Sequence, residues 1–326
     1  MRRINLYYQK PPAGYKYIPG DKYIFNAFRN LVKTKKMSGL DKVMVNLCKG
    51  FDKLNVNYTV NPPYSKIKPG EPVITLGVGK YALKGYSLVN PVIAGIGLMT
   101  HPSEWPTLLQ EYPVVKYLQH SPWTRDIYVS YFGKDVCDLW PSGIDTDYWG
   151  PGAKSEKNTD FLVYAKFLFD KEKNNDLLKS PILNKLDELG YSYKEIIYGQ
   201  YTEMDYQSLL RQCRAMIFLC EHESQGFACC EAMAMDVPIF AWDQGRWLDI
   251  NWLKVNDPAT PATSVPFFDE RCGMKFKDVD AFGKTIVLFF DKLKSNDFTP
   301  RDYILQHLTL EKSAERMLEI INSVYK

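Results

Sequence analysis

The sequence predicts an α/β protein with two domains, each built on a parallel sheet. Short apolar runs alternate along the chain with stretches of helical spacing, a pattern typical of βα units. One unit stands out because Ala215–Cys220 is a short bounded apolar run, Phe227–Met235 is rich in helix formers, and Ile239–Trp242 is apolar again. The length of 326 residues is enough for two domains with sizeable cores.

Charge is almost balanced over the whole chain but is uneven along it. The net charge is +3, with 19 Lys/Arg against 11 Asp/Glu in residues 1–150 and 22 against 27 in residues 151–326. A basic first half suits an anionic acceptor or peripheral contact with an anionic membrane, and ordinary surface bias explains it equally well. No nucleic-acid motif is present, so we expect no nucleic-acid partner.

The pattern of cysteines and the first residues of the sequence indicate the cellular compartment. Seven Cys residues include no C-x-x-C pair, and most of them fall in apolar or helical contexts, which is typical of buried reduced thiols. The first residues enter a strand directly, with no secretory apolar segment. No apolar run approaches the roughly 20 residues that span a bilayer. We therefore expect a cytoplasmic protein, with peripheral membrane contact left open.

In the first half, strands alternate with loops and one clear helix. The helix is expected from Ser38 to about Leu54, because Val43, Leu47 and Phe51 are spaced for one apolar face. Gly39, which opens it, suits either a phosphate neighbour or a plain turn. Residues 11–36 are expected to form a long loop with some helix. The expected strands are Ile4–Tyr8, Asn57–Val60, Val73–Leu76, Pro91–Ala94, Val114–Leu118 and Val136–Trp140.

The second half repeats the alternation after a polar linker at residues 152–159. Its expected strands, besides those of the clear unit, are Phe161–Ala165 and Lys194–Tyr198. Helices are expected at Tyr206–Cys213 and from about Val279 to Leu293, and the stretch between Trp242 and Val279 is expected to be irregular. Residues 303–325 have an amphipathic helical pattern.

The turn before the expected helix at Phe227 carries the chemistry of the chain. Gly226 permits a tight turn, and the N–H groups that follow it, at Phe227 and Ala228, suit a phosphate or diphosphate. Glu223 and Glu231 cannot bind phosphate, because like charges repel, and suit hydroxyls of a sugar or a ribose. Two Glu residues at this spacing also occur by chance as solvated surface.

This stretch closely resembles the E-x7-E region of retaining nucleotide-sugar glycosyltransferases of family 4. The resemblance rests on Glu223, Gly226, the run Glu231-Ala-Met-Ala and a following strand bounded by Pro238. It implies the GT-B fold, in which two Rossmann-like domains face each other across a cleft. In that family the first Glu contacts the transferred sugar, the second binds the ribose, and the glycine turn lies against the diphosphate. The family usually has Gly-Phe where this chain has Ser-Gln, directly after the first Glu.

Other segments extend the resemblance. Pro141-Ser-Gly143-Ile-Asp145 resembles the P-N-G-[VI]-D segment that joins the two domains of the family. The C-terminal pattern resembles the helix that crosses back to the first domain. The implied domains are residues 1–143 with 309–326, which would bind the acceptor, and residues 144–308, which would bind the donor.

A pair of cations is implied after the strand Phe161–Ala165. The family has Gly-Arg at the end of this strand and a Lys five residues later, and the two cations clamp the donor diphosphate. Lys166 and Lys171 have that spacing, although Ala165 replaces the Gly and Lys166 the Arg. A lysine keeps the charge and loses the bidentate fork. Both lysines could instead be surface charges in a Lys-rich patch.

His101 and Gly39 are implied as site residues of the first domain. The family often has a His near the transferred sugar and a glycine-rich loop near the donor diphosphate, although a lone His is more often structural. Asp145-Thr-Asp147 fits a D-x-D metal pattern, but it follows no buried strand of a donor domain, so we expect no metal and no cofactor.

The implied function is transfer of a sugar from a GDP- or UDP-sugar to a hydroxyl of a glycan, a glycolipid or another acceptor. The expected reaction retains the anomeric configuration and is independent of metal. Two alternatives stay open: a non-hydrolysing sugar-nucleotide epimerase, which would need further acid/base carboxylates, and a non-catalytic sugar-nucleotide-binding protein.

Overall fold

The structure is a computed structural model that describes residues 2–10, 38–152, 157–252 and 259–325. Its contacts divide the chain into two compact units. Unit 1 contains Met1–Gln119, Ile127–Trp140 and Ala314–Lys326, and unit 2 contains His120–Asp126 and Pro141–Ser313. The loop expected at 11–36 lies outside the described residues, as does part of the linker at 152–159. The domain limits inferred from the sequence remain predictions.

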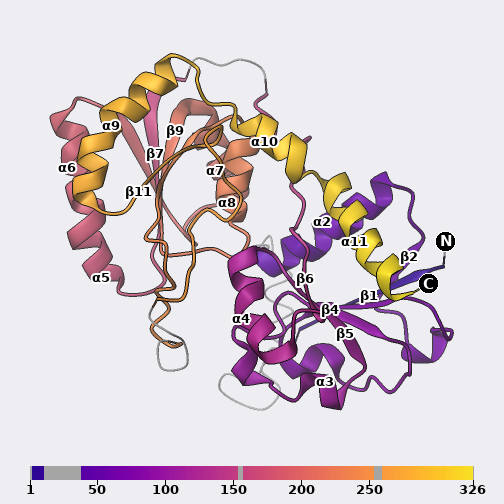
Figure 1. Cartoon of the computed structure of the whole chain (residues 1–326). Helices are drawn as coiled ribbons and strands as arrows, with labels where there is room; N and C mark the ends of the chain where they lie inside the picture. The colour runs from indigo at the N-terminus through magenta and orange to yellow at the C-terminus, as the bar shows by residue number, and fades with distance from the viewer. Residues whose placement is uncertain (1, 11–37, 153–156, 253–258, 326) are drawn as a thin grey trace, which may run out of the picture. The chain divides into compact units, whose positions relative to one another are not determined.

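Unit 1 is built on a sheet of six strands, which pair in parallel in the order β2-β1-β3-β4-β5-β6 (Figure 1). The chain adds β2 on one side of β1 and β3 on the other, so the winding direction reverses there. The strands are β1 (Ile4–Gln9), β2 (Tyr58–Val60), β3 (Val73–Gly77), β4 (Val92–Gly95), β5 (Val114–Gln119) and β6 (Cys137–Leu139).

The helix expected after Ser38 is present as α2 (Gly39–Lys53). A capping box starts it: the Ser38 side chain accepts from the Asp41 N–H, and the Asp41 carboxylate accepts from the Ser38 N–H. Unit 1 also contains α3 (Leu108–Glu111) and the 3-10 helices η1 (Tyr64–Lys66), η2 (Gly79–Leu83) and η3 (Pro102–Glu104). Helices α4 (Pro122–Phe132) and α11 (Leu310–Val324) begin in unit 2 and end in unit 1.

Unit 2 has a second parallel sheet, with the order β11-β10-β9-β7-β8. Its strands are β7 (Thr159–Lys166), β8 (Tyr193–Ile197), β9 (Cys213–Cys220), β10 (Ile239–Trp242) and β11 (Gly273–Phe276). Its helices are α5 (Lys171–Asn174), the π-helical turn η4 (Asn175–Lys179), α6 (Ser180–Glu188), α7 (Glu203–Gln212), α8 (Phe227–Ala234), α9 (Val279–Lys294) and α10 (Pro300–His307). In the described parts of the chain, no helix is long and apolar enough to cross a bilayer.

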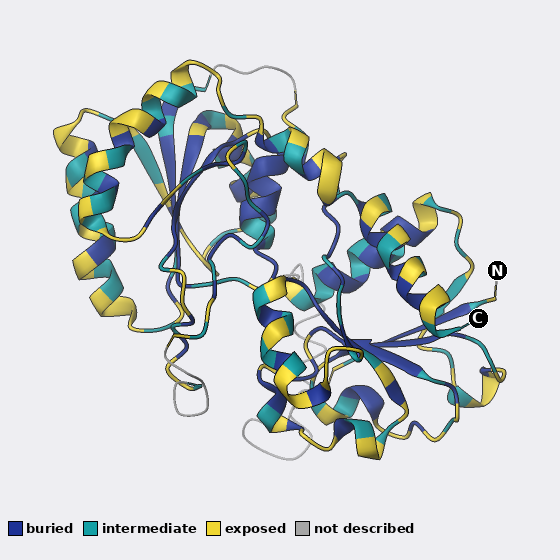
Figure 2. Ribbon diagram, viewed as in Figure 1, coloured by how far each residue is buried: buried dark blue, intermediate teal, exposed yellow. Residues whose placement is uncertain are grey.

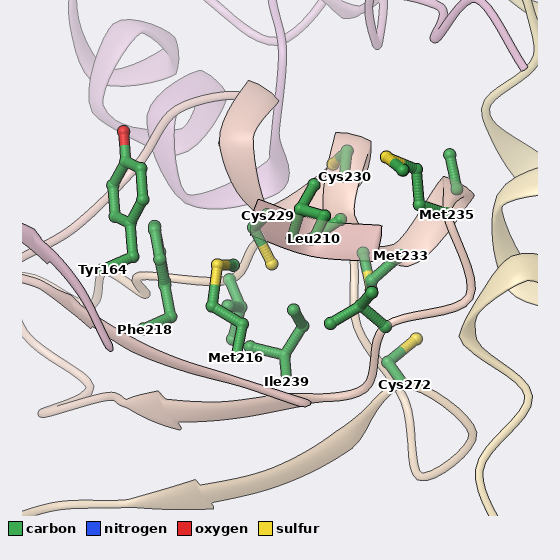
Figure 3. Packing of buried hydrophobic residues seen from close by; sticks show 14 of the residues in the cluster. Tyr164, Leu210, Met216, Phe218, Cys229, Cys230, Met233, Met235, Ile239 and Cys272 are labelled. Carbon is green, nitrogen blue, oxygen red and sulfur yellow. The ribbon is translucent and has the colours of Figure 1, made fainter. Parts of the chain in front are cut away.

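Both faces of the unit 2 sheet are covered, which explains why its central strands β7 and β9 contain the continuous apolar runs Phe161–Ala165 and Ala215–Cys220. In β7, Phe161 and Val163 pack in a cluster with α6 and α9, whereas Leu162 and Tyr164 pack in a cluster with α7 and α8. Figure 1 shows these helix pairs on opposite faces, and Figure 2 shows the strands buried and the outer helix faces exposed. Figure 3 shows Met216 of β9 and Cys229 of α8 meeting in the second cluster.

The expected strands are present to within a few residues, and two features differ from the prediction. β11 lies in the stretch expected to be irregular, because four residues give too short an apolar signal. The pattern at 303–325 is two helices, α10 and α11, rather than one. The break follows from a backbone pairing: the Ile144 N–H donates to the Leu308 carbonyl at 2.7 Å, and Ile144 forms a parallel bridge with Thr309.

Candidate functional site

The order of strands in unit 2 identifies the edge of the sheet where a ligand is expected. The chain runs from β7 to β8 on one side and then to β9 on the other side of β7, so the winding reverses between β7 and β9. In open α/β sheets, ligands bind beyond the carboxyl ends of the strands at such a reversal. Lys166 at the end of β7 pairs with Cys220 at the end of β9. The segment that follows Cys220 contains Glu223.

Lys166 and Glu223 meet at this point. The Lys166 amine donates to Glu223 Oε1 at 2.5 Å, and only 14% and 13% of the two side chains are exposed. The Glu223 backbone is held on both sides, because its N–H donates to the Thr263 carbonyl at 2.9 Å and its carbonyl accepts from Trp123 Nε1 at 3.0 Å. The carboxylate therefore has a defined position, and the structure brings together two of the predicted site residues.

The ammonium group of Lys166 has a second neighbour. Its nitrogen lies 4.7 Å from the centre of the Tyr198 ring. Tyr198 follows β8 and is exposed. Burial works to lower the pKa of Lys166, but the Glu223 carboxylate more than offsets burial, so the pKa is raised. Lys166 is a cation at every pH at which the protein would be assayed.

The turn from Glu223 to α8 contains Gln225, one of the two residues that depart from the family pattern. Gln225 is buried, with its side-chain oxygen accepting from the Ser142 N–H at 2.9 Å and its amide donating to the Ser142 carbonyl at 3.0 Å. Gln225 thus closes the backbone of the segment 141–143 against the start of α8. Gly226 is the N-cap and has φ of 70°, in the left-handed region that favours glycine.

Helix α8 contains three of the predicted donor-binding residues, Phe227, Ala228 and Glu231. Phe227 and Ala228 form its first turn, where the N–H groups of a helix have no intrahelical acceptor and are aimed out of its end. Glu231 lies in the second turn and is buried, with 3% of its surface exposed. Burial first, and the nearby Glu231 carboxylate second, raise the pKa of the Cys230 thiol well above its usual value.

Lys171 is the first residue of α5 and is exposed. It is joined to Lys166 by the loop 167–170, which ends at Asp170 in the left-handed conformation with φ of 45°. The loop is attached to Glu221, which follows β9 directly. Glu221 Oε1 accepts from the N–H groups of Leu168 and Phe169, both at 3.1 Å.

Sequence reasoning missed Glu221 and its neighbour His222. The His222 ring lies among three aromatic rings, with centres 5.6 Å from Trp123, 5.8 Å from Phe169 and 6.1 Å from Trp247. Burial, with the Lys166 cation as a second cause, lowers the pKa of His222 to about 4. The available signal was the position of both residues between a predicted strand and Glu223. Most of their contacts involve residues far away in the sequence.

The other two predicted site residues, His101 and Gly39, lie in unit 1. His101 is buried and caps η3, because its Nδ1 accepts from the Ser103 N–H at 3.2 Å and lies 2.7 Å from Ser103 Oγ. Gly39 begins α2, where the Asp41 carboxylate already accepts from the Ser38 N–H. The same carboxylate pairs with the Lys10 ammonium at 2.7 Å, so a cation lies beside this helix end as well. The roles of His101 and Gly39 remain predictions.

The described residues contain no group of three or more His, Cys, Asp or Glu side chains arranged to hold a metal ion. Asp145, from the D-x-D pattern, caps a turn instead, with its Oδ1 accepting from the Tyr148 N–H at 3.1 Å.

Comparison with known proteins gives likenesses of structure. No protein-family model matches the chain, and no curated protein matches it in sequence. The pneumococcal O-GlcNAc transferase GtfA, in complex with UDP and GlcNAc, matches with a TM-score of 0.54 and 12% identity over 80% of this chain and 58% of GtfA. The chain thus spans little more than half the length of GtfA.

Two further structures match along nearly their whole length. The lipopolysaccharide outer core galactosyltransferase WaaB has a TM-score of 0.54 and 10% identity, over 98% of this chain and 99% of WaaB. Sucrose-phosphate synthase from Thermosynechococcus elongatus has a TM-score of 0.52 and 12% identity, over 100% of this chain and 99% of the synthase. At these identities the likenesses show the fold, an α/β fold of the GT-B class with two Rossmann-like domains, as predicted from the sequence.

Proposed function

We propose that this chain is a retaining glycosyltransferase of the family 4 type that transfers a sugar from a nucleotide-diphosphate sugar to an acceptor hydroxyl. The observation that carries the proposal is the pairing of Lys166 with Glu223 at the strand ends where the winding of the unit 2 sheet reverses. Helix α8 begins directly after Gly226, at the end of the turn that Glu223 opens. A cation and helix N–H groups suit a diphosphate, and a carboxylate suits the hydroxyls of the linked sugar.

The proposed reaction exchanges one bond of the anomeric carbon for another. The bond between the anomeric carbon and the diphosphate oxygen breaks, a bond to the acceptor oxygen forms on the same face, and the acceptor proton passes to the departing phosphate. The main barrier is the negative charge that develops on the diphosphate. Lys166, Lys171 and the first N–H groups of α8 would stabilise that charge electrostatically, so the reaction needs no metal.

The ion pair also suggests how donor binding proceeds. Before the donor arrives, Lys166 and Glu223 neutralise each other at 2.5 Å. A diphosphate offers Lys166 a stronger anion, which would leave the Glu223 carboxylate available to accept from a sugar hydroxyl. Glu231 would bind the ribose. Diphosphate binding and orientation of the sugar would then be coupled through one lysine.

The proposed donor is a UDP- or GDP-sugar, and the acceptor is a hydroxyl of a glycan or glycolipid. UDP-sugars come first, because GtfA was solved with UDP and GlcNAc. The epimerase alternative would need a further carboxylate free to exchange protons in the site. Glu221 does not suit that role, because it is buried and accepts from backbone N–H groups.

A donor panel tests the proposal. Thermal unfolding and donor hydrolysis are measured with UDP-, GDP-, ADP- and TDP-sugars in the presence of EDTA. A donor at 100 times its Kd stabilises the fold by about 2.7 kcal/mol, which is measurable in a thermal scan. We expect a shift with one base and slow hydrolysis that is lost in Glu223→Gln and Lys171→Ala. Lys173→Ala is the matched control, since Lys173 is also exposed on α5. Absence of a shift with every nucleotide would refute the proposal.

A further inference from the structure

Glu221 is a buried carboxylate that binds a loop far away in the sequence. Only 3% of its surface is exposed. Oε1 accepts from the N–H groups of Leu168 and Phe169 at 3.1 Å and from Asn174 Nδ2 at 3.2 Å, and Oε2 also accepts from Leu168 at 3.1 Å. The same Asn174 amide donates to the Phe169 carbonyl at 3.0 Å. One side chain therefore holds the loop after β7 and the first turn of α5.

Burial of the Glu221 carboxylate is only partly offset by its contacts, so its pKa lies above the usual value for a glutamate. Burial raises the pKa of Glu221, while the N–H donors of Phe169 and Leu168, and the charge of Lys166, act in the opposite direction. Backbone N–H groups in a loop have no partner from regular structure and need acceptors when buried. A single carboxylate oxygen can satisfy several of them at once. Glu221 thereby holds the conformation of a loop that forms no ladder of backbone hydrogen bonds with a neighbouring strand.

The loop that Glu221 holds connects the two predicted clamp cations. Lys166 is the last residue of β7 and is fixed by the sheet and by Glu223. Lys171 is the first residue of α5 and is exposed. The path between them is the loop 167–170, in which Asp170 adopts a left-handed φ of 45° that non-glycine residues rarely adopt. The contacts of Glu221 join this loop to the end of β9, in addition to the burial of Phe167 and the packing of the Phe169 ring against His222, and so contribute to the position of Lys171 relative to β7.

We propose that Glu221 is a positioning residue that fixes the loop 167–170 and thereby sets the position of Lys171 for the donor diphosphate. This inference rests on the proposed function, because it assigns Glu221 to the same diphosphate clamp. Glu221 touches no substrate and acts through Lys171. Its negative charge is not the useful property, since a carboxylate near a diphosphate repels it. The useful property is the reach of its oxygen to the loop.

The chain offers variants that separate reach from charge. Glu221→Gln keeps an oxygen that can accept from Leu168, Phe169 and Asn174, and it removes the charge. Glu221→Asp keeps the charge and shortens the side chain by one methylene, which removes the contacts. We therefore expect Gln to preserve the clamp and Asp to behave like Ala. Asn174→Ala removes two hydrogen bonds, to Glu221 Oε1 and to the Phe169 carbonyl, and leaves Glu221 in place, so it replaces Glu221→Ala in the test if that variant does not fold.

The test measures the Kd of UDP and of UMP for the full chain by calorimetry, or of the nucleotide pair whose base the donor panel selects. We expect Glu221→Ala and Glu221→Asp to weaken binding of the diphosphate about 10-fold, Asn174→Ala about 3-fold, and Glu221→Gln less than about 3-fold. UMP lacks the second phosphate, so its Kd should change by less than about 2-fold in every variant.

A double-mutant cycle with Lys171→Ala tests the route of the effect. If Glu221 acts through Lys171, the double variant binds UDP no more than about 2-fold more weakly than Lys171→Ala alone, because interacting residues are non-additive. Losses that multiply, or equal weakening of UMP and UDP, would show that Glu221 only supports the fold. If the cycle is made with Asn174→Ala, the same criterion applies. Failure of the wild-type protein to bind any nucleoside diphosphate would remove the proposed function and this inference together.

Discussion

The Lys166–Glu223 pair is the feature of single residues on which the proposed chemistry depends most. Both side chains are largely buried, and a buried cation that loses its partner is left without compensation. Removal of one partner therefore costs stability, and the donor would have to rearrange the same contact. Stability and function are therefore linked at this pair.

We expect Glu223→Gln to lower the free energy of unfolding by about 1–3 kcal/mol, because it leaves the Lys166 cation partly buried and unpaired. Urea unfolding measures the loss. The double variant Lys166→Met with Glu223→Gln should regain part of it. The control is Asp291→Asn, which breaks a pair with Lys294 whose side chains are both 58% exposed, and it should cost at most about 0.5 kcal/mol. Equal losses for the two single variants would contradict this account of the pair.

His222 gives the protein a pH dependence. Its pKa in the folded state is about 4, below the usual value near 6.5, so the unfolded chain binds the proton first as the pH falls. The contribution of His222 to the free energy of unfolding is constant above about pH 6.5 and decreases as the pH falls from there toward 4. At pH 5 this single group should cost about 2 kcal/mol relative to pH 8.

The measurement compares the unfolding free energy of the wild type and of His222→Phe across this pH range. The difference between the two proteins should shift by about 2 kcal/mol in favour of the variant on going from pH 8 to pH 5. The other histidines are common to both proteins and cancel. His307→Gln, at an exposed residue of α10, serves as the control. A pH-independent difference would show that the His222 ring is not buried as described.

At the scale of elements, the turn before α8 joins the site to the helix. Gly226 has φ of 70°, and a Cβ there would meet Glu223 and Pro266 atoms at 3.6–3.7 Å, which is ordinary contact. The constraint is therefore the backbone conformation and not space. Gly190, after α6, has φ of 71° and nothing within 4 Å. The two glycines have nearly the same φ and lie in different parts of unit 2.

Gly226→Ala and Gly190→Ala should each lower stability by about 1–2 kcal/mol, the cost of a left-handed residue with a Cβ. Only Gly226→Ala should also reduce donor hydrolysis, because relaxing its φ moves Glu223 relative to the first turn of α8. Urea unfolding and donor hydrolysis are measured on both variants. A similar loss of hydrolysis in Gly190→Ala would mean that the effect reflects stability alone.

The elements of the site were predictable where they depend on local sequence. The sequence predicts β9, α8 and β10 from their apolar runs and from Gly226 and Pro238. The ends of β7 and α8 were predicted from the same local signals. Lys166 and Glu223 were identified by family resemblance, and the parallel register of β7 and β9 shows why they meet. These parts agree because local propensity and the global fold favour the same structure.

Other parts depend on contacts between distant segments, which a single sequence does not contain. Gln225 pairs with Ser142 across 83 residues, and Glu221 binds Leu168 across 53. Nothing local distinguishes Glu221 from a solvated Glu after a strand. The break between α10 and α11 likewise depends on the pairing of Ile144 with Thr309. Sequence periodicity alone continues the helical pattern through that point.

At the scale of the whole molecule, the end of the chain stabilises its beginning. Residues 314–326 belong to unit 1, with Met317, Ile320 and Ile321 buried. Arg316 donates to the Leu139 carbonyl at 3.1 Å and pairs with Asp138. The N–H of Val73 in β3 donates to the Tyr325 hydroxyl at 3.0 Å, across 252 positions. Residues 314–325 are therefore part of the packed core of unit 1.

We expect Ile320→Ala to destabilise unit 1 by about 2–5 kcal/mol, the usual cost of truncating a buried Ile. Two units need not unfold together, so hydrogen exchange of the full chain is the suitable measurement. Protection should fall in β1, β3 and β4 of unit 1, far before the substitution in the chain, and should stay high in β7 and β9 of unit 2. Glu319→Ala, next to it on an exposed side of α11, should change protection by at most about 0.5 kcal/mol. A loss of protection confined to α10 and α11 would show that the C-terminal helix is only attached to unit 1 and does not stabilise its sheet.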